Sequence, residues 1–166
     1  MSDASDKLCF LVVDDQPLIT GALSMLLTSE NPDSEVFTAN SVDEARKLVH
    51  SHAPEADLLI LDLSMPGVVG TSLLEEFVRE EPSLKILVLS GVTDRESVMN
   101  TLSLGAAGFV PKTLDTDLLL TAIHFVLKGG VYLPSKIIEE SQRRGFFAEA
   151  GEGIAGRMAS APTLTP

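Results

Sequence analysis

Five strand-like runs recur along the chain and limit the folds available to it, and all but the second are mainly apolar without alternation. They lie near residues 8–13, 35–38, 57–62, 84–89 and 107–111, and segments with helical spacing of apolar residues separate them. Such continuous runs are typical of strands buried on both faces of a parallel sheet. Strands that alternate with helices predict right-handed βαβ units. We therefore expect an α/β fold, a doubly wound five-stranded parallel sheet in the flavodoxin-like order 2-1-3-4-5, with helices on both faces.

Five helical segments are expected between these runs. In the first, Pro17 to Thr28, apolar residues at helical spacing predict one apolar face made of Leu18, Ala22, Met25 and Leu26. The second begins at Ser41, a predicted N-cap that forms a capping box with Glu44. The remaining helices are expected at 71–80, 94–104 and 115–128, with Gly129-Gly130 ending the last of them.

Four of the apolar runs stop at polar residues suited to a phosphoryl group. The first stops at Asp14-Asp15, the third at Asp62, the fourth at Ser90 and the fifth at Lys112. Ligands of such sheets bind just beyond the carboxyl ends of the strands. We therefore expect three carboxylates, a hydroxyl and an ammonium to meet at one edge of the sheet.

This set of side chains suits phosphoryl transfer to a carboxylate. Clustered carboxylates repel one another, and a hard cation such as Mg²⁺ relieves that repulsion through oxygen ligation. A carboxylate can act as the nucleophile, while a metal ion and a lysine stabilise the transferred group. The sequence contains no P-loop and no glycine-rich dinucleotide turn.

Composition excludes several function classes. The formal charge of −12, from 12 basic and 24 acidic residues, disfavours binding of nucleic-acid phosphates by this chain alone. The single cysteine, Cys9, permits neither an internal disulfide nor a cysteine zinc site, and we interpret it as a core thiol. The N-terminus lacks signal-peptide features and no run approaches a membrane span, so we expect a soluble cytoplasmic protein without membrane partners.

Four motifs, taken together in this order and spacing, resemble the receiver domain of two-component response regulators, which has the CheY-like fold. The resemblance spans roughly residues 7–133. The matching segments are Val12-Val13-Asp14-Asp15, Leu61-Asp62-Leu63-Ser64-Met65-Pro66-Gly67 with Gly70, Leu89-Ser90-Gly91, and Gly105-Ala106-Ala107-Gly108-Phe109-Val110-Pro111-Lys112.

The resemblance implies roles for the acidic residues. Asp62 is implied to accept a phosphoryl group from the phosphohistidine of a sensor histidine kinase. Asp15 would ligate Mg²⁺ (or Mn²⁺) directly, Asp14 would act through water, and Ser64 would contribute its backbone carbonyl. The metal set implied in this way comprises Asp14, Asp15, Asp62 and Ser64.

The resemblance also implies a switch that phosphorylates and dephosphorylates itself, rather than a turnover enzyme. Lys112 would contact the phosphoryl group, Ser90 would move toward it as the switch hydroxyl, and Phe109 would turn inward as the switch aromatic. Such a switch is a population shift between two packings. We expect Val92 to hinder attack by water on the phosphorylated residue to a modest extent.

Several segments resemble the NarL/FixJ-type subfamily, whose members carry a LuxR-type helix-turn-helix after a linker. We expect a receiver domain at 1–133, an extra helix at 134–147 and a flexible linker at 148–166. The expected protein is the receiver half of a longer transcription regulator, which would bind DNA only through a C-terminal domain absent from this chain. The alternative is a stand-alone or degenerate receiver that acts as a protein-binding module.

The last predicted helix has more apolar residues than one face needs. Leu119, Ala122, Ile123 and Val126 form one stripe, and Leu118 and Phe125 lie about 100° away from it. The second pair is either a partner surface, as in a homodimer, or the margin of a wide core stripe. A metal-dependent phosphatase is a further rival, but its Asp-x-Asp motif does not match the adjacent Asp14 and Asp15.

Overall fold

The computed structural model describes residues 7–112 and 115–134. Within these ranges it contains a parallel sheet of five strands in the order β2-β1-β3-β4-β5. The strands are β1 (Cys9–Val13), β2 (Glu35–Ala39), β3 (Leu58–Asp62), β4 (Ile86–Ser90) and β5 (Gly108–Pro111). The predicted fold class and strand order are confirmed.

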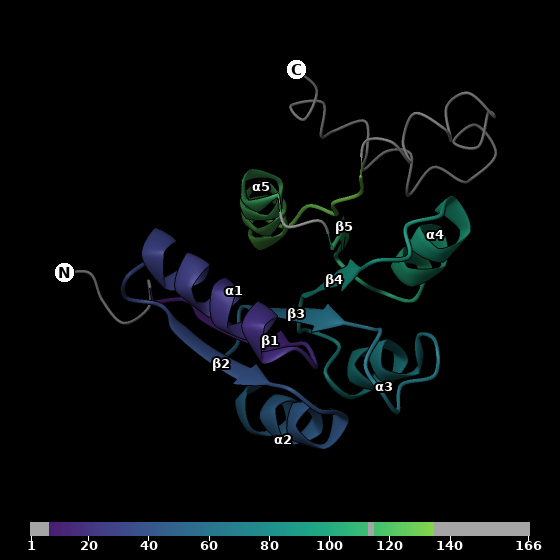
Figure 1. The fold of residues 1–166 in the computed structure, drawn as a ribbon, viewed down its shortest axis with the longest axis horizontal. Coiled ribbons are helices and arrows are strands. Elements are labelled where there is room, and N and C mark those ends of the chain that lie inside the picture. Colours follow the sequence, from purple (N-terminus) through teal and green to yellow (C-terminus); the bar gives the residue numbers. More distant parts are fainter. Residues whose placement is uncertain (1–6, 113–114, 135–166) are drawn as a thin grey trace.

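The described helices cover both faces of the sheet (Figure 1). They are α1 (Pro17–Glu30), α2 (Val42–His52), α3 (Ser72–Glu80), α4 (Arg95–Ser103) and α5 (Thr116–Leu127). Helices α1 and α5 lie on one face, and α2, α3 and α4 lie on the other. One hydrophobic cluster fills each interface between the sheet and its helices, which explains why β1, β3 and β4 are buried throughout their lengths.

Helix α1 lies where it was predicted, but the apolar residues that predicted it are not the ones that it buries. Leu18 and Met25 are 83% and 74% exposed, and Ala22 is also exposed, whereas Leu26 is partly buried. The residues that face the sheet are Thr20, Leu23 and Leu27. Thr20 can lie there because its hydroxyl donates to the Pro17 carbonyl and accepts from the Asn40 side chain. A satisfied threonine therefore takes a place that hydrophobic periodicity alone assigns to an apolar residue.

The predicted cap of α2 is confirmed, with a small difference in its second bond. The Ser41 hydroxyl accepts from the Glu44 backbone N–H at 3.1 Å. The Glu44 carboxylate reaches back to the N–H of Asn40, at 2.8 Å, which is one residue before the N-cap. The arrangement still satisfies two backbone donors around the start of the helix.

Helix α5 ends as predicted, at its pair of glycines. Gly129 has a positive φ of 100°, and the N–H groups of Gly129 and Gly130 donate to the carbonyls of Val126 and Phe125. These two bonds form a Schellman motif, which needs a residue that tolerates the left-handed conformation.

The two α5 residues that the sequence allowed as either a partner surface or a core margin belong to the margin of the core. Leu118 and Phe125 are partly buried and pack against the same cluster as the buried stripe of α5. The Phe125 ring also lies directly over Gly130, where a Cβ atom would collide with it. Both side chains therefore already have contacts within this domain.

Cys9 is buried within β1, as predicted for a core thiol. Burial, together with the nearby Glu55, Glu35 and Asp57 carboxylates, raises the pKa of this thiol to about 11. No described helix is long and apolar enough to cross a membrane. The helix expected at 134–147 and the linker expected at 148–166 lie almost entirely outside the described residues.

Candidate functional site

Backbone hydrogen bonds fix Asp14 just beyond the end of β1. Its N–H donates to the Ala39 carbonyl at 3.1 Å, and its Oδ1 accepts from the Gln16 N–H at 2.9 Å. The Asn40 side-chain amide donates to the Asp14 carbonyl at 2.8 Å. The Asp14 side chain is fully buried, while Asp15 is only partly so. Burial raises the pKa of Asp14 above its ordinary value, against the opposing effects of the Lys112 ammonium and the Gln16 N–H.

Asp62 is the last residue of β3 and is also fully buried. The Ser64 backbone N–H donates to Asp62 Oδ1 at 2.9 Å, which orients the carboxylate. Because β3 lies between β1 and β4 in the sheet, this carboxylate stands in the middle of the carboxyl edge. The sequence motif that places Ser64 two residues after Asp62 therefore produces a local hydrogen bond that holds the acid in place.

Lys112 brings a positive charge to both acids. It follows β5, and its N–H donates to the Ser90 carbonyl at 2.9 Å, which ties it to the end of β4. Its Nζ lies 2.9 Å from Asp14 Oδ2 and 3.1 Å from Asp62 Oδ2. Partial burial alone would lower the pKa of Lys112, but hydrogen bonds to Asp14 and Asp62 outweigh it and raise that pKa.

The acidic cluster has the chemistry of a metal site. One carboxylate oxygen each from Asp14, Asp15 and Asp62 lies within 4.8 Å of the other two. Asp14 Oδ2 is buried, and its partner within the described residues is the Lys112 ammonium at 2.9 Å, which it shares with Asp62. Three carboxylates around one ammonium leave an excess of negative charge, and ligation of a hard cation offsets the repulsion between them. These three side chains therefore fit a divalent cation that prefers oxygen ligands.

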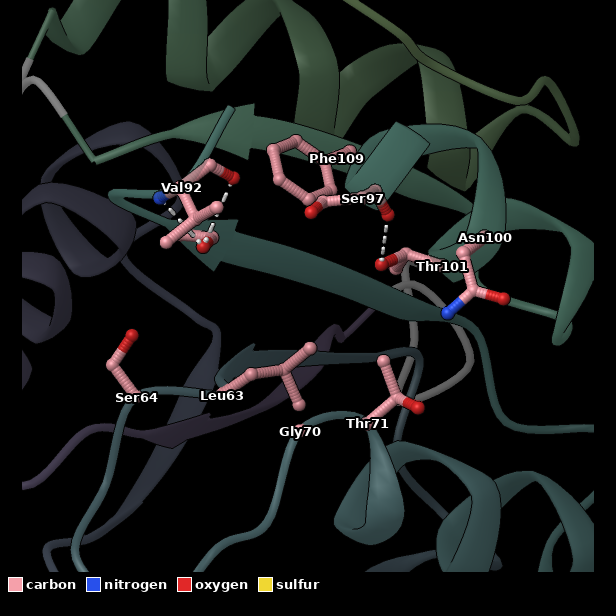
Figure 2. A pocket seen from close by; sticks show the side chains of 10 residues that line it. Leu63, Ser64, Gly70, Thr71, Val92, Ser97, Asn100, Thr101 and Phe109 are labelled. Carbon is pink, nitrogen blue, oxygen red and sulfur yellow. Dashed lines mark hydrogen bonds between the residues drawn. The ribbon is translucent and has the colours of Figure 1, made fainter. Parts of the chain in front are cut away.

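Ser90 is the last residue of β4, and Phe109 lies within the neighbouring strand β5, beside the acidic cluster. The Ser90 hydroxyl accepts from the Val92 N–H at 3.0 Å and donates to the Val92 carbonyl at 3.3 Å. Phe109 is only 1% exposed, and both residues line a cavity of about 360 Å³ between the segment after β3 and helix α4 (Figure 2). The Ser90 hydroxyl is thus bonded within its own loop.

The structure brings Asp14, Asp15, Asp62 and Lys112 into one cluster, with Ser64 beside Asp62. Sequence reasoning missed Asn40, which bonds the backbone of Asp14 and the side chain of Thr20. The signal was available, because Asn40 directly follows β2 just as the other polar residues follow their strands. It was overlooked because β2 has fewer apolar residues than the other runs.

Comparison with known proteins identifies the family of the chain. The response regulator receiver domain family matches residues 10–124, and these residues include the acids, Ser90 and Lys112. This chain belongs to that family. The resemblance to receiver domains that the sequence motifs indicated is therefore confirmed.

Curated relatives of this receiver domain include transcription regulators. It is 34% identical over 135 residues to the glycerol metabolism activator of Pseudomonas putida, covering 81% of this chain and 61% of that protein. It is 30% identical over 132 residues to the transcriptional regulatory protein DegU of Brevibacillus brevis, covering 80% and 55%. The chain thus spans less than two thirds of the length of these relatives.

Solved structures agree with this assignment. A LuxR family DNA-binding response regulator from Silicibacter pomeroyi matches with a TM-score of 0.66 and 28% identity, covering 78% of this chain and 98% of that one. A chain of the CheX-CheY-BeF3-Mg+2 complex from Borrelia burgdorferi matches with a TM-score of 0.67 and 27% identity, covering 72% of this chain and 88% of that one. The chain is a receiver domain similar to those of LuxR-type and NarL-type response regulators.

Proposed function

We propose that this chain is a phosphorylation-activated receiver that accepts a phosphoryl group on Asp62 from a histidine kinase and switches a transcription-regulating output. The observation that carries the proposal is the position of Asp62. Its Oδ1 accepts from the Ser64 N–H at 2.9 Å, and its Oδ2 lies 3.1 Å from Lys112 Nζ, beside Asp14. A relative from Burkholderia pseudomallei, 26% identical with a TM-score of 0.62, is described as having a phosphorylated aspartic acid.

In the proposed reaction, a carboxylate oxygen of Asp62 forms a bond to phosphorus as the phosphorus–nitrogen bond of the donor phosphohistidine breaks. The Ser64 N–H holds the carboxylate in one orientation during the approach. The Lys112 ammonium would turn from its ion pairs to the charged oxygens of the transferred group. Positioning and charge stabilisation of this kind account for most of the catalysis in phosphoryl transfer.

The metal proposed for this site is Mg²⁺, with Mn²⁺ as a substitute. Asp14, Asp15 and Asp62 would hold it, together with the backbone carbonyl of Ser64. When bound, it would supply positive charge opposite the equatorial oxygens of the phosphoryl group. The excess of carboxylate over ammonium charge in this cluster supports this assignment.

The proposed output begins at Ser90 and Phe109. A phosphoryl group on Asp62 offers the Ser90 hydroxyl a charged acceptor in place of its long, 3.3 Å bond to the Val92 carbonyl. Movement of Ser90 would change the cavity that Phe109 lines and shift the population of the loop before α4. Asp62, Lys112 and Ser90 are thus the proposed reactive residues, with Ser90 and Phe109 as the switch.

The proposed partners follow from this function. A sensor histidine kinase would approach the cluster of acidic residues at the carboxyl edge of the sheet. Helix α1 begins close to this cluster in the sequence, at Pro17, and its exposed Leu18 and Met25 would offer the kinase apolar contacts. A homodimer of the receiver is the proposed state of the active form. DNA would be contacted through a C-terminal helix-turn-helix domain of the longer regulator, in the cytoplasm.

Incubation with Mg²⁺ and acetyl phosphate tests the proposal. Intact-mass spectrometry should detect the addition of one phosphoryl group, and Asp62→Asn should abolish it. Asp33→Asn is the matched control, because Asp33 is an exposed acid that precedes β2, at the edge of the sheet opposite the carboxyl ends. Absence of the adduct in the wild-type protein would favour a degenerate binding module, and turnover of phosphate esters would favour a phosphatase.

A further inference from the structure

A partly buried contact links the turn after β2 to the loop that carries Asp14 and Asp15. Asn40 is the first residue after β2, and its side-chain nitrogen donates to the Asp14 carbonyl at 2.8 Å and to Thr20 Oγ1 at 3.0 Å. An amide nitrogen has two protons, so these two bonds use both of them. Asn40 therefore joins the loop after β1 to helix α1.

The Asn40 side chain is held in one orientation by its neighbours. Its backbone N–H donates to Glu44 Oε1 at 2.8 Å. Thr20 is 3% exposed, and its hydroxyl donates to the Pro17 carbonyl at 3.2 Å, which leaves its oxygen lone pairs to accept from Asn40. A side chain that is fixed in this way can in turn fix a third group, and here that group is the Asp14 carbonyl.

The two acids of this loop differ in how their carboxylates are held. Asp14 is fixed through its own side chain, because Oδ1 accepts from the Gln16 N–H and Oδ2 lies 2.9 Å from the Lys112 ammonium. Asp15 is only partly buried, and within the described residues its carboxylate has no hydrogen bond or ion pair to hold it. The direction of the Asp15 side chain therefore depends on the backbone that carries it.

Asn40 controls one of the two peptide groups that flank Asp15. The peptide group between Asp14 and Asp15 is planar, so a hydrogen bond to its carbonyl oxygen also fixes the plane in which the Asp15 nitrogen lies. Asn40 donates to that oxygen. The peptide group on the other side of Asp15 is fixed by the bond from the Gln16 N–H to Asp14 Oδ1.

We propose that Asn40 is a positioning residue for the divalent cation at the acidic cluster, acting through the peptide group that carries Asp15. This inference rests on the metal site of the proposed function. With the Asn40 bond in place, the loop presents the Asp15 carboxylate within 4.8 Å of the other two acids before a cation arrives. Without it, the cost of ordering the loop opposes binding. Groups that orient metal ligands in this way typically change metal affinity by about 10- to 100-fold.

Titration of the full chain with Mn²⁺, followed by the paramagnetic relaxation of water protons, tests this role. Asn40→Ala should weaken Mn²⁺ binding about tenfold. Ser41→Ala is the matched control, because it removes the side-chain bond to the Glu44 N–H from the next residue of the same turn and leaves the Asn40 amide in place. It should leave the affinity unchanged. Urea denaturation should show a loss of stability in both variants, so a loss of affinity in only one of them does not come from lower stability.

A second pair of variants acts on the other bond of the Asn40 amide. Thr20→Val removes the acceptor that orients the amide and should weaken Mn²⁺ binding roughly threefold, the lower end of the cost of one hydrogen bond. Thr20→Ser keeps the hydroxyl and should bind Mn²⁺ as the wild-type protein does. In the metal-free proteins, ¹⁵N relaxation should show more motion of the Asp15 and Gln16 amides in Asn40→Ala than in Ser41→Ala.

The outcomes separate this role from the proposed function. Wild-type affinity in Asn40→Ala, or equal losses of affinity in Asn40→Ala and Ser41→Ala, would overturn the role of Asn40 alone. Failure of the wild-type protein to bind Mn²⁺ would overturn the metal assignment and this inference with it. A protein whose Mn²⁺ binding depends on Asn40 but which forms no adduct with acetyl phosphate would overturn the proposed function and retain the role of Asn40.

Discussion

The carboxyl edge of the sheet is divided into two unlike halves. Over β1, β3 and β5, the buried carboxylates of Asp14 and Asp62 both contact the partly buried Lys112 ammonium, and backbone N–H groups fix both carboxylates. Over β4 and α4, hydroxyl and apolar side chains surround an open cavity, and the exposed loop 91–94 crosses its edge. Phosphoryl transfer requires fixed geometry, whereas a switch requires space and two arrangements of similar energy. The difference between the halves matches the proposed function, in which one half would receive a signal and the other would report it.

The largest effect is expected from removing the ammonium of the charged half. Lys112→Met should slow formation of the acetyl phosphate adduct by about 100-fold or more, because no other described side chain places a cation at Asp62. It should also cost a few kcal/mol of stability, roughly 3, because two buried acids lose their counter-ion. Mass spectrometry over time and urea denaturation measure the two effects.

The control for this variant is Lys85→Met. Lys85 Nζ donates to the Leu127 carbonyl near the end of α5, so this change removes an ammonium that does not contact either acid. It should alter stability slightly and leave the rate of adduct formation unchanged. Equal rates in Lys112→Met and the wild-type protein would show that the charged half is not the receiving site.

Asp14→Asn should stabilise the protein in the absence of metal, by about 1 kcal/mol. Asn keeps an oxygen that accepts from the Gln16 N–H, and it removes a carboxylate whose pKa is raised by burial. Because the folded protein holds the Asp14 proton more tightly than the unfolded chain, ionisation lowers wild-type stability as the pH rises from the ordinary value near 3.8 to the raised pKa.

The gain in Asp14→Asn should therefore be constant above the raised pKa and should vanish as the pH falls to about the ordinary value. Urea denaturation at several pH values, without metal, measures it. Asp33→Asn, at an exposed acid, should show no such gain. A loss of stability in Asp14→Asn at neutral pH would mean that the Lys112 ion pair outweighs the burial of the charge.

Ser90→Ala should preserve the reaction in the charged half and abolish the response to it in the uncharged half. Adduct formation should remain within a few-fold of the wild-type rate, because Asp62 and Lys112 are untouched. The NMR shifts that phosphorylation causes in α4 and at Phe109 should disappear, while Ser90→Thr, which keeps the hydroxyl, should retain them. Persistence of these shifts in Ser90→Ala would show that the signal leaves the charged half by another route.

The sequence predicted the charged half better than the helices around it. The acids and the lysine could be placed together because the ends of buried parallel strands must share one edge, whatever the loops do. Helix α5 was also predicted correctly, because its stripe of Leu119, Ala122, Ile123 and Val126 is the widest on that helix. The strong periodicity of α5 and the order of strands and helices along the chain could therefore both be recognised from the sequence.

The residues that α1 buries could not be identified from its sequence, for a physical reason. Apolar residues occur all round it, so periodicity offers two faces of similar quality and the choice depends on tertiary contacts. The deciding contact is the bond from Asn40 to Thr20, which comes from a residue 20 positions away. The cavity could not be predicted from the sequence either, because it depends on how closely α4 approaches the segment after β3.

The smallest effect is expected at Val92, which is 57% exposed at the junction of the two halves. Its side chain would shield the phosphorylated Asp62 only partly from water, so Val92→Ala should speed loss of the phosphoryl group by roughly threefold, well under 1 kcal/mol in the barrier. Val92→Phe should slow the same loss by a similar factor. Mass spectrometry after removal of acetyl phosphate measures the decay. Identical decay in all three proteins would mean that the loop before α4 does not control water access, and that the uncharged half reports phosphorylation without affecting its lifetime.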